Sequence, residues 1–214
     1  MSVFHEVVKD VWIWSWPSPE KGYNFNGLLL KDGIHCVLVD PVSPGEAGLA
    51  SLEPYAPFDA IYLTNKDHER LALEIRDKFE TPVWIHEKDA GLLKGKPNHT
   101  FREGDRLLCG IEVLHLPDQK TPGECAFYIP HRGLLIVGDA LIGVPAGKLS
   151  MLPETKYRNF YRARIGLERL RPLYFETLLV GDGVPVLREA HEVLEQFFLN
   201  SKSGQVPDQN ALND

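Results

Sequence analysis

The chain has 214 residues, of which 43% are hydrophobic and 25% are charged. These fractions are close to the averages of soluble globular proteins, so they exclude an intrinsically disordered chain and a fibrous repeat. The net charge of −7 and the lack of a long run of Lys or Arg also argue against a nucleic-acid partner.

The first residues form neither a basic segment nor an apolar stretch, and no apolar run reaches the roughly 18 residues that a membrane span needs. We therefore expect a cytoplasmic protein that does not enter the membrane. The three cysteines, Cys36, Cys109 and Cys125, are odd in number and widely spaced. This pattern predicts small core residues rather than a disulfide framework.

The first half of the chain is rich in expected strands. These strands are residues 11–16, 26–30, 35–40, 60–64 and 82–85. The turn KDG at 31–33 joins the second and third strands as a hairpin. A helix is expected at 71–79, because Leu71, Ile75 and Phe79 recur at helical spacing. The order predicts a strand, loop, helix, strand unit after a β-rich opening.

The second half repeats this rhythm and then becomes helical. Further strands are expected at residues 111–114, 126–129, 134–137 and 178–180. Apolar residues at helical spacing predict helices at 157–170 and 186–199. Residues 201–214 are polar and without periodicity, which predicts a flexible tail. No low-complexity linker divides residues 1–200, so we expect one domain, a layered α/β sandwich.

Several short segments, taken in chain order, resemble the metallo-β-lactamase superfamily. They are NGLLL at 26–30, VLVDP at 37–41, residues 61–70, TPG at 121–123 and GDAL at 138–141. Each is common by itself, but their order and their positions at strand ends are hard to obtain by chance. The resemblance covers about residues 24–199. It implies a four-layer αββα sandwich with His and Asp ligands at one edge, where one or two metal ions, usually zinc, activate water for hydrolysis.

The first ligand motif of that superfamily is altered in this chain. Where the family has His-x-His-x-Asp-His after a strand, residues 65–70 read NKDHER, so no histidine falls on a ligand position. A second alignment, shifted by two residues, puts Asp67 and His68 on the closing Asp-His pair. The second alignment leaves Leu63 and Asn65 where the first two histidines belong.

The remaining ligand positions are altered too. Lys120 precedes TPG where the family has a histidine, and a protonated amine cannot coordinate a metal. The bridging aspartate is retained as Asp139, and Asp182 lies between two glycines in the closing loop. Arg70 occupies the last position of the first motif and is a fixed cation.

These changes predict that charge pairs replace the metal ions. We expect Arg70 and Lys120 to neutralise Asp139 and Asp182 directly. The same hydrogen-bonded network is expected to include Asn65, His68 and Glu124. The alternative is a solvated rim of charges with no function.

The resemblance implies a hydrolase that cleaves a small ester, thioester or lactone. Two residues would position water and two cations would stabilise the oxyanion. The residues expected to carry this chemistry are His68, Asp139, Lys120 and Arg70. The residues expected to contact the substrate are Asn65, Glu124 and Lys148.

A non-catalytic domain that binds a small molecule, an anion or a partner is the alternative function. No cofactor is expected under the first alignment. Under the second, one divalent ion (manganese, iron, magnesium or zinc) could be bound by Asp67, His68, Asp139 and Asp182.

Overall fold

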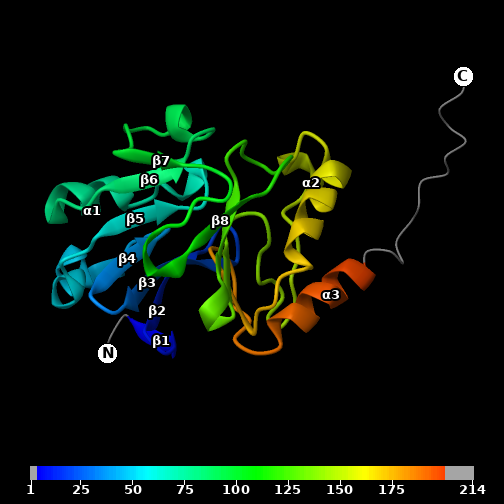
Figure 1. The fold of residues 1–214 in the computed structure, drawn as a ribbon, viewed down its shortest axis with the longest axis horizontal. Helices are drawn as coiled ribbons and strands as arrows, with labels where there is room; N and C mark the ends of the chain where they lie inside the picture. The colour runs from blue at the N-terminus through cyan, green and yellow to red at the C-terminus, as the bar shows by residue number, and fades with distance from the viewer. Residues whose placement is uncertain (1–3, 201–214) are drawn as a thin grey trace, which may run out of the picture.

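The computed structural model describes residues 4–200, and their strands form two sheets (Figure 1). The larger sheet has seven strands in chain order: β1 (His5–Val8), β2 (Val11–Ser18), β3 (Tyr23–Asp32), β4 (His35–Val39), β5 (Ala60–Leu63), β6 (Val83–His86) and β7 (His99–Phe101). The smaller sheet has four strands, in the order β11 (Thr177–Val180), β10 (Leu134–Val137), β9 (Cys125–Ile129) and β8 (Glu112–His115). The tail expected at 201–214 lies outside the described residues.

Both sheets are mixed. In the larger one, β1 to β4 are antiparallel neighbours, and from β4 onward each strand runs parallel to the next. In the smaller one, β8, β9 and β10 are antiparallel, and β11 runs parallel to β10. The carboxyl ends of β4 and β5 therefore lie together, as do those of β10 and β11.

Alternating residues of each strand face different layers. Leu28 and Leu30 of β3 belong to the core between the sheets, together with Phe127 of β9. Leu29 points the other way and packs in the cluster that contains Ile75 of helix α1 (Ala72–Phe79). Side chains two residues apart share a face of a strand, so one sheet supplies both the inner and the outer core.

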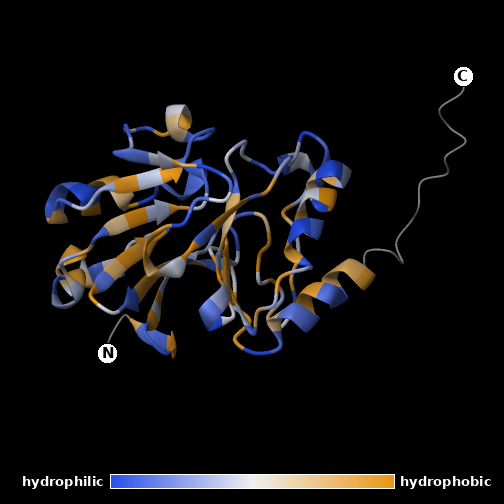
Figure 2. Ribbon diagram, in the orientation of Figure 1, coloured by the Kyte–Doolittle hydropathy of each residue, from blue (hydrophilic) through white to orange (hydrophobic). Residues whose placement is uncertain are grey.

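The smaller sheet is covered in the same way. On its outer face Leu135 and Val137 of β10 pack with Leu194 of helix α3 (Ala190–Asn200). Helix α2 (Phe160–Gly166) precedes the turn containing Leu167, which joins the same cluster. Figure 1 shows α1 on one side of the sheets and α2 and α3 on the other, and Figure 2 shows apolar residues running through the strands. The expected αββα sandwich is confirmed.

Two helices differ from the expectation. The segment 157–170 is divided, because the Asn159 side chain accepts a hydrogen bond from Arg162 N at 2.9 Å and so begins α2 at Phe160. After Gly166 the chain continues as a 3-10 turn. Helix α3 begins only at Ala190, because Val186 forms backbone bonds with Leu178 of β11.

The edge strands β1 and β7 were not expected. They have 4 and 3 residues, and most of these are exposed or half-buried. Such short segments give no alternation that a sequence pattern could reveal. No helix among residues 4–200 is long and apolar enough to cross a membrane.

Candidate functional site

The carboxyl ends of four strands meet at one edge of the sandwich. Asp40 follows β4, Thr64 follows β5, Asp139 follows β10 and Asp182 follows β11 by one or two residues. A loop between β8 and β9 adds Lys120. We call the charged residues at this edge the ion network: Asp40, Asp67, His68, Arg70, Lys120, Asp139 and Asp182.

Asp40 anchors the first part of the network. Its carboxylate accepts bonds from the Thr64 amide at 2.9 Å and the Thr64 hydroxyl at 2.6 Å, and it lies 2.7 Å from Nδ1 of His68. Asp40 itself has a φ of 47°, a left-handed conformation that Asp tolerates better than most residues. The sharp turn after β4 thus directs its carboxylate toward the end of β5.

Asn65 fixes the turn that carries the network. Its Oδ1 accepts from Asp67 N at 2.9 Å, which starts the short turn Lys66–His68. Its Nδ2 donates to Oε1 of Glu124 at 3.2 Å, and the amide of Ala140 donates to the same oxygen at 3.2 Å. Asn65 and Glu124 are both fully buried, so they stabilise the network from the protein interior and do not face solvent.

Burial raises the pKa of Glu124 well above its ordinary value, and the nearby carboxylate of Asp139 raises it further. The environment therefore favours the neutral acid. This protonation leaves Oε1 free to accept its two bonds while one fewer negative charge is buried.

Lys120 joins two carboxylates. Its Nζ lies 2.6 Å from Asp139 and 2.8 Å from Asp67. Burial lowers the pKa of Lys120, but Asp139 and Asp67 outweigh burial and raise the pKa above its ordinary value. Lys120 is therefore a fixed cation at this position.

Arg70 makes the second pair. One guanidinium nitrogen, Nη2, lies 2.7 Å from Asp182 and 3.0 Å from Nε2 of His68. The guanidinium also lies over the Phe25 ring, 4.6 Å from its centroid. The Asp182 side chain is only 5% exposed, and its burial raises its pKa despite the nearby His68 and Arg70.

His68 connects the two halves of the network. Its Nδ1 faces Asp40, and its Nε2 lies 3.3 Å from Asp139. Burial and Arg70 lower the pKa of His68, but Asp40 and Asp139 outweigh them and raise it to about 10. The cationic ring then donates to both carboxylates. Arg70 can donate to Nε2 only when the ring is neutral.

Two glycines make room for this imidazole. A Cβ on Gly181 would lie 2.5 Å from Cε1 of His68, and a Cβ on Gly138 would lie 2.2 Å from Oγ1 of Thr64. Neither φ value is positive, so space alone requires glycine at these positions. A side chain at Gly181 would push the His68 ring out of its position between the two aspartates, and one at Gly138 would displace the Thr64 hydroxyl beside the ring.

The charges of the network are nearly balanced. Four carboxylates face the cations His68, Arg70 and Lys120, and Lys66 adds a fourth cation beside Asp67. Lys120 has three N–H groups and two carboxylate partners, so one N–H remains. Among the described residues, Nε of Arg70 also has no acceptor.

Three residues of the ion network are possible metal ligands. His68, Asp139 and Asp182 offer ligand atoms that lie within 4.8 Å of one another, so a candidate ligand cluster exists. Nη2 of Arg70, however, already lies against two of these three groups. A zinc ion about 2.0–2.2 Å from its ligands would need the Nε2 lone pair of His68, which the cationic ring lacks, and it would lie beside the guanidinium of Arg70. The residues, as arranged, do not fit a metal ion.

The structure brings together most of the residues singled out from the sequence. Arg70 pairs with Asp182 and Lys120 with Asp139, and Lys120 also pairs with Asp67. Lys148 lies elsewhere: it is exposed and lines a separate cavity with residues of α2 and α3.

Two residues near the ion network, Glu69 and Asp40, have roles that the sequence analysis did not identify. Glu69 lies just before α1, but its carboxylate accepts the amides of Lys94 at 3.1 Å and Gly95 at 2.9 Å. Asp40 was not singled out as a site residue. The sequence does contain a signal for Asp40, because this charged residue directly follows the apolar residues 36–39 of β4. The ends of neighbouring parallel strands share one edge, where binding sites often lie.

Comparison with known proteins identifies the family of the chain. The family model described as the metallo-beta-lactamase superfamily matches residues 3–200. The chain belongs to this superfamily. The Bacillus subtilis protein named "Probable metallo-hydrolase YqgX" is 28% identical over 211 residues, covering 83% of this chain and 93% of that protein.

Solved structures of the superfamily share the fold. A metallo-beta-lactamase from Pontibacter korlensis matches with a TM-score of 0.75 at 18% identity, over 92% of this chain and 98% of that one. TTHA1623, solved in a di-iron-bound form, matches with a TM-score of 0.62 at 27% identity, over 76% of this chain and 89% of that one. The chain is thus metallo-hydrolase-like in sequence and fold.

Proposed function

We propose that the ion network is a metal-independent binding site for a small molecule that presents a carbonyl or carboxylate oxygen. One observation carries the proposal: two fixed cations occupy the carboxylates that a metal would need. Arg70 lies 2.7 Å from Asp182, and Lys120 lies 2.6 Å from Asp139. Each cation keeps an N–H beyond these pairs, and a ligand oxygen can accept it.

The exposed fractions of the side chains also favour a ligand with an acceptor oxygen. The carboxylates of Asp139 and Asp182 are each 5% exposed, whereas the side chains of Arg70 and Lys120 are 16% and 26% exposed. A ligand that approaches from solvent therefore meets the N–H donors of Arg70 and Lys120 before it meets Asp139 and Asp182. It also meets Asp67, whose side chain is 32% exposed and pairs with Lys66 and Lys120. Such a surface favours an acceptor oxygen on the ligand.

The protonation of the network favours binding over hydrolysis. Hydrolysis needs a group that takes a proton from water. Burial raises the pKa of Asp139, but His68 and Lys120 outweigh burial and lower it well below its ordinary value, which makes this carboxylate a weak base. His68, with its pKa raised to about 10, is protonated at neutral pH and cannot accept another proton.

We infer further that the site works without a cofactor. The only imidazole in the candidate ligand cluster is His68, and the other donors are carboxylates already bound to cations. Tight zinc sites prefer several imidazole or thiolate ligands.

Hydrolysis of a small ester, thioester or lactone is the second candidate. It is favoured by the retained Asp139 and by the N–H donors of Lys120 and Arg70, which could stabilise an oxyanion. In this case His68 must be neutral to act as a base. The rate should then rise with pH toward about 10, the pKa of His68.

The test uses γ-butyrolactone and its ring-opened product, γ-hydroxybutyrate, as probes. We expect calorimetry to detect binding of at least one of them, weakened at least about tenfold by Lys120→Met because a charge-assisted bond is lost. Lys88→Met, a change at an exposed lysine outside the network, is the matched control.

Three results would contradict the binding proposal. They are the absence of binding by both probes, equal binding by the Lys120→Met variant, and binding that a chelator abolishes. Opening of the lactone ring, followed by proton NMR and faster at higher pH, would instead establish the hydrolase.

A further inference from the structure

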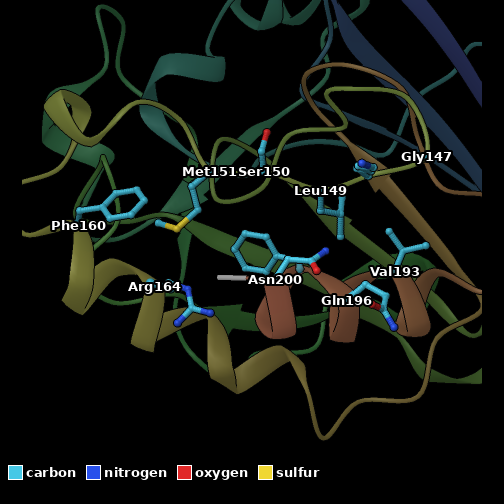
Figure 3. Close-up of a pocket in the computed structure, with 11 residues that line it drawn as sticks. Gly147, Leu149, Ser150, Met151, Phe160, Arg164, Val193, Gln196 and Asn200 are labelled. Carbon is cyan, nitrogen blue, oxygen red and sulfur yellow. The ribbon is translucent and has the colours of Figure 1, made fainter. Parts of the chain in front are cut away.

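A cavity lies away from the ion network, between the loop 147–151 and helices α2 and α3. Its volume is about 600 Å³, and no residue of the ion network lines it. Figure 3 shows Phe160 and Arg164 on one side and Val193, Gln196 and Asn200 on another. Cavities of this size that are mostly apolar and have a few polar groups are typical of small-molecule sites.

The apolar part of the lining comes from all three segments. The residues are Leu149, Met151, Phe160, Val193 and Phe197. They form a surface that would favour a hydrocarbon group over water.

Two cations lie at this cavity without a carboxylate partner. The side chain of Lys148 has no hydrogen bond or ion pair with any described residue. Arg164 donates from Nη2 to the carbonyl of Phe198 at 3.0 Å and lies over the rings of Phe197 and Phe198. Its Nε is buried and has no acceptor.

Exposed side chains such as Lys88 and Arg188 also lack an acidic partner among residues 4–200, so it is the half-buried position of Arg164, with its buried and unbonded Nε, that points to a ligand. The guanidinium of Arg171 in the neighbouring turn, by contrast, pairs with Glu168 and Glu195. An uncompensated, partly buried guanidinium is unfavourable unless a ligand supplies an acceptor.

We propose that this cavity binds a small monocarboxylic acid with an apolar tail. The carboxylate pairs with the Nη N–H groups of Arg164 that do not bind Phe198, and Lys148 adds positive potential at the exposed rim. The tail lies among the apolar side chains of the lining. This ligand satisfies the charge and the apolar surface together, which neither a neutral lipid nor a cation does.

Octanoate tests the proposal, with octanol and octylammonium as uncharged and oppositely charged analogues. Calorimetry on the full chain should show octanoate binding more tightly than both analogues. We expect Lys148→Gln to weaken octanoate binding roughly two- to fivefold, as for an exposed ion pair. Arg164→Gln should weaken it at least about tenfold, because a charge-assisted bond in a half-buried position is lost.

Two further variants keep the test specific. Lys88→Gln removes an exposed lysine elsewhere and should leave octanoate binding unchanged. Val193→Phe fills the cavity without altering charge and should abolish binding. If Arg164→Gln fails to fold, Lys148→Gln and Val193→Phe still decide the outcome.

Three results would overturn the proposal. The first is equal affinity for octanoate and octanol, and the second is an affinity for octanoate that none of the cavity variants changes. The third concerns residues 201–214, which follow Asn200 of the lining: if octanoate binds only after a stop codon removes them, the chain's own C-terminal segment is the occupant.

Discussion

The pair between Arg70 and Asp182 can be weighed by a double-mutant cycle. Arg70→Met leaves the Asp182 carboxylate, 5% exposed, without its cation, and we expect a loss of about 3 kcal/mol in the free energy of unfolding. Asp182→Asn leaves Arg70, which is 16% exposed and still lies over Phe25, so the loss should be smaller, about 1–2 kcal/mol.

The double variant contains neither uncompensated charge. Its loss should be smaller than the sum of the single losses by about 1–3 kcal/mol, the coupling of groups in direct contact. Urea denaturation of the four proteins measures this difference, provided that the slope with urea is the same in all. Losses that add would show that Arg70 and Asp182 do not stabilise each other.

An exposed pair provides the matched control. Lys78 and Glu53 lie 2.7 Å apart, but their side chains are 35% and 57% exposed. The cycle of Lys78→Met with Glu53→Gln should give a coupling below about 1 kcal/mol, because solvent screens the pair. A similar coupling in both cycles would mean that burial does not strengthen the network.

Three further outcomes are expected. Elemental analysis should find far less than one zinc per chain, and a chelator should leave Tm unchanged; stoichiometric metal, lost on mutation of His68, would refute this. The raised pKa of His68 should stabilise the fold fully below its ordinary value of 6.5, and that stability should be lost as pH rises through about 10. The free energy of unfolding, measured from pH 6 to pH 10, should no longer show this pH dependence in the His68→Gln variant. Glu124→Gln should keep stability at neutral pH within about 1 kcal/mol, because Gln retains the acceptor for Asn65 and Ala140, while Glu124→Ala should cost about 2–4 kcal/mol by leaving both donors unsatisfied; equal losses would contradict a neutral Glu124.

Much of the fold could be predicted because short runs of consecutive apolar residues, bounded by turn residues, indicate buried strands. Leu28, Leu29 and Leu30 alternate between two cores, and the same pattern recurs in β10. The ends of helices were less predictable. Asn159 begins α2 by a side-chain hydrogen bond, and Val186 is held by a backbone bond to β11, and neither effect follows from hydrophobic spacing.

The candidate site was predictable in membership but not in pairing. The order of motifs indicated which loops converge, and strand ends indicated that Asp139 and Asp182 would meet the cations. Which cation meets which aspartate depends on side-chain reach across loops that are distant in sequence. The same limit applies to Lys148, whose position near Asp139 in the chain gave no information about the direction of its loop.

The ion network also bears on how the chain folds. Its members are far apart in sequence: His68 and Asp139 are separated by 71 positions, and Arg70 and Asp182 by 112. Contacts of such separation form late in folding, because closing a long loop loses chain entropy before the new contact contributes any stabilisation. The amino-terminal half alone would hold Arg70 and His68 without Asp139 or Asp182, and the carboxyl-terminal half would hold the reverse. The site therefore exists only once both sheets have docked, and ligand binding there would be a late marker of complete folding.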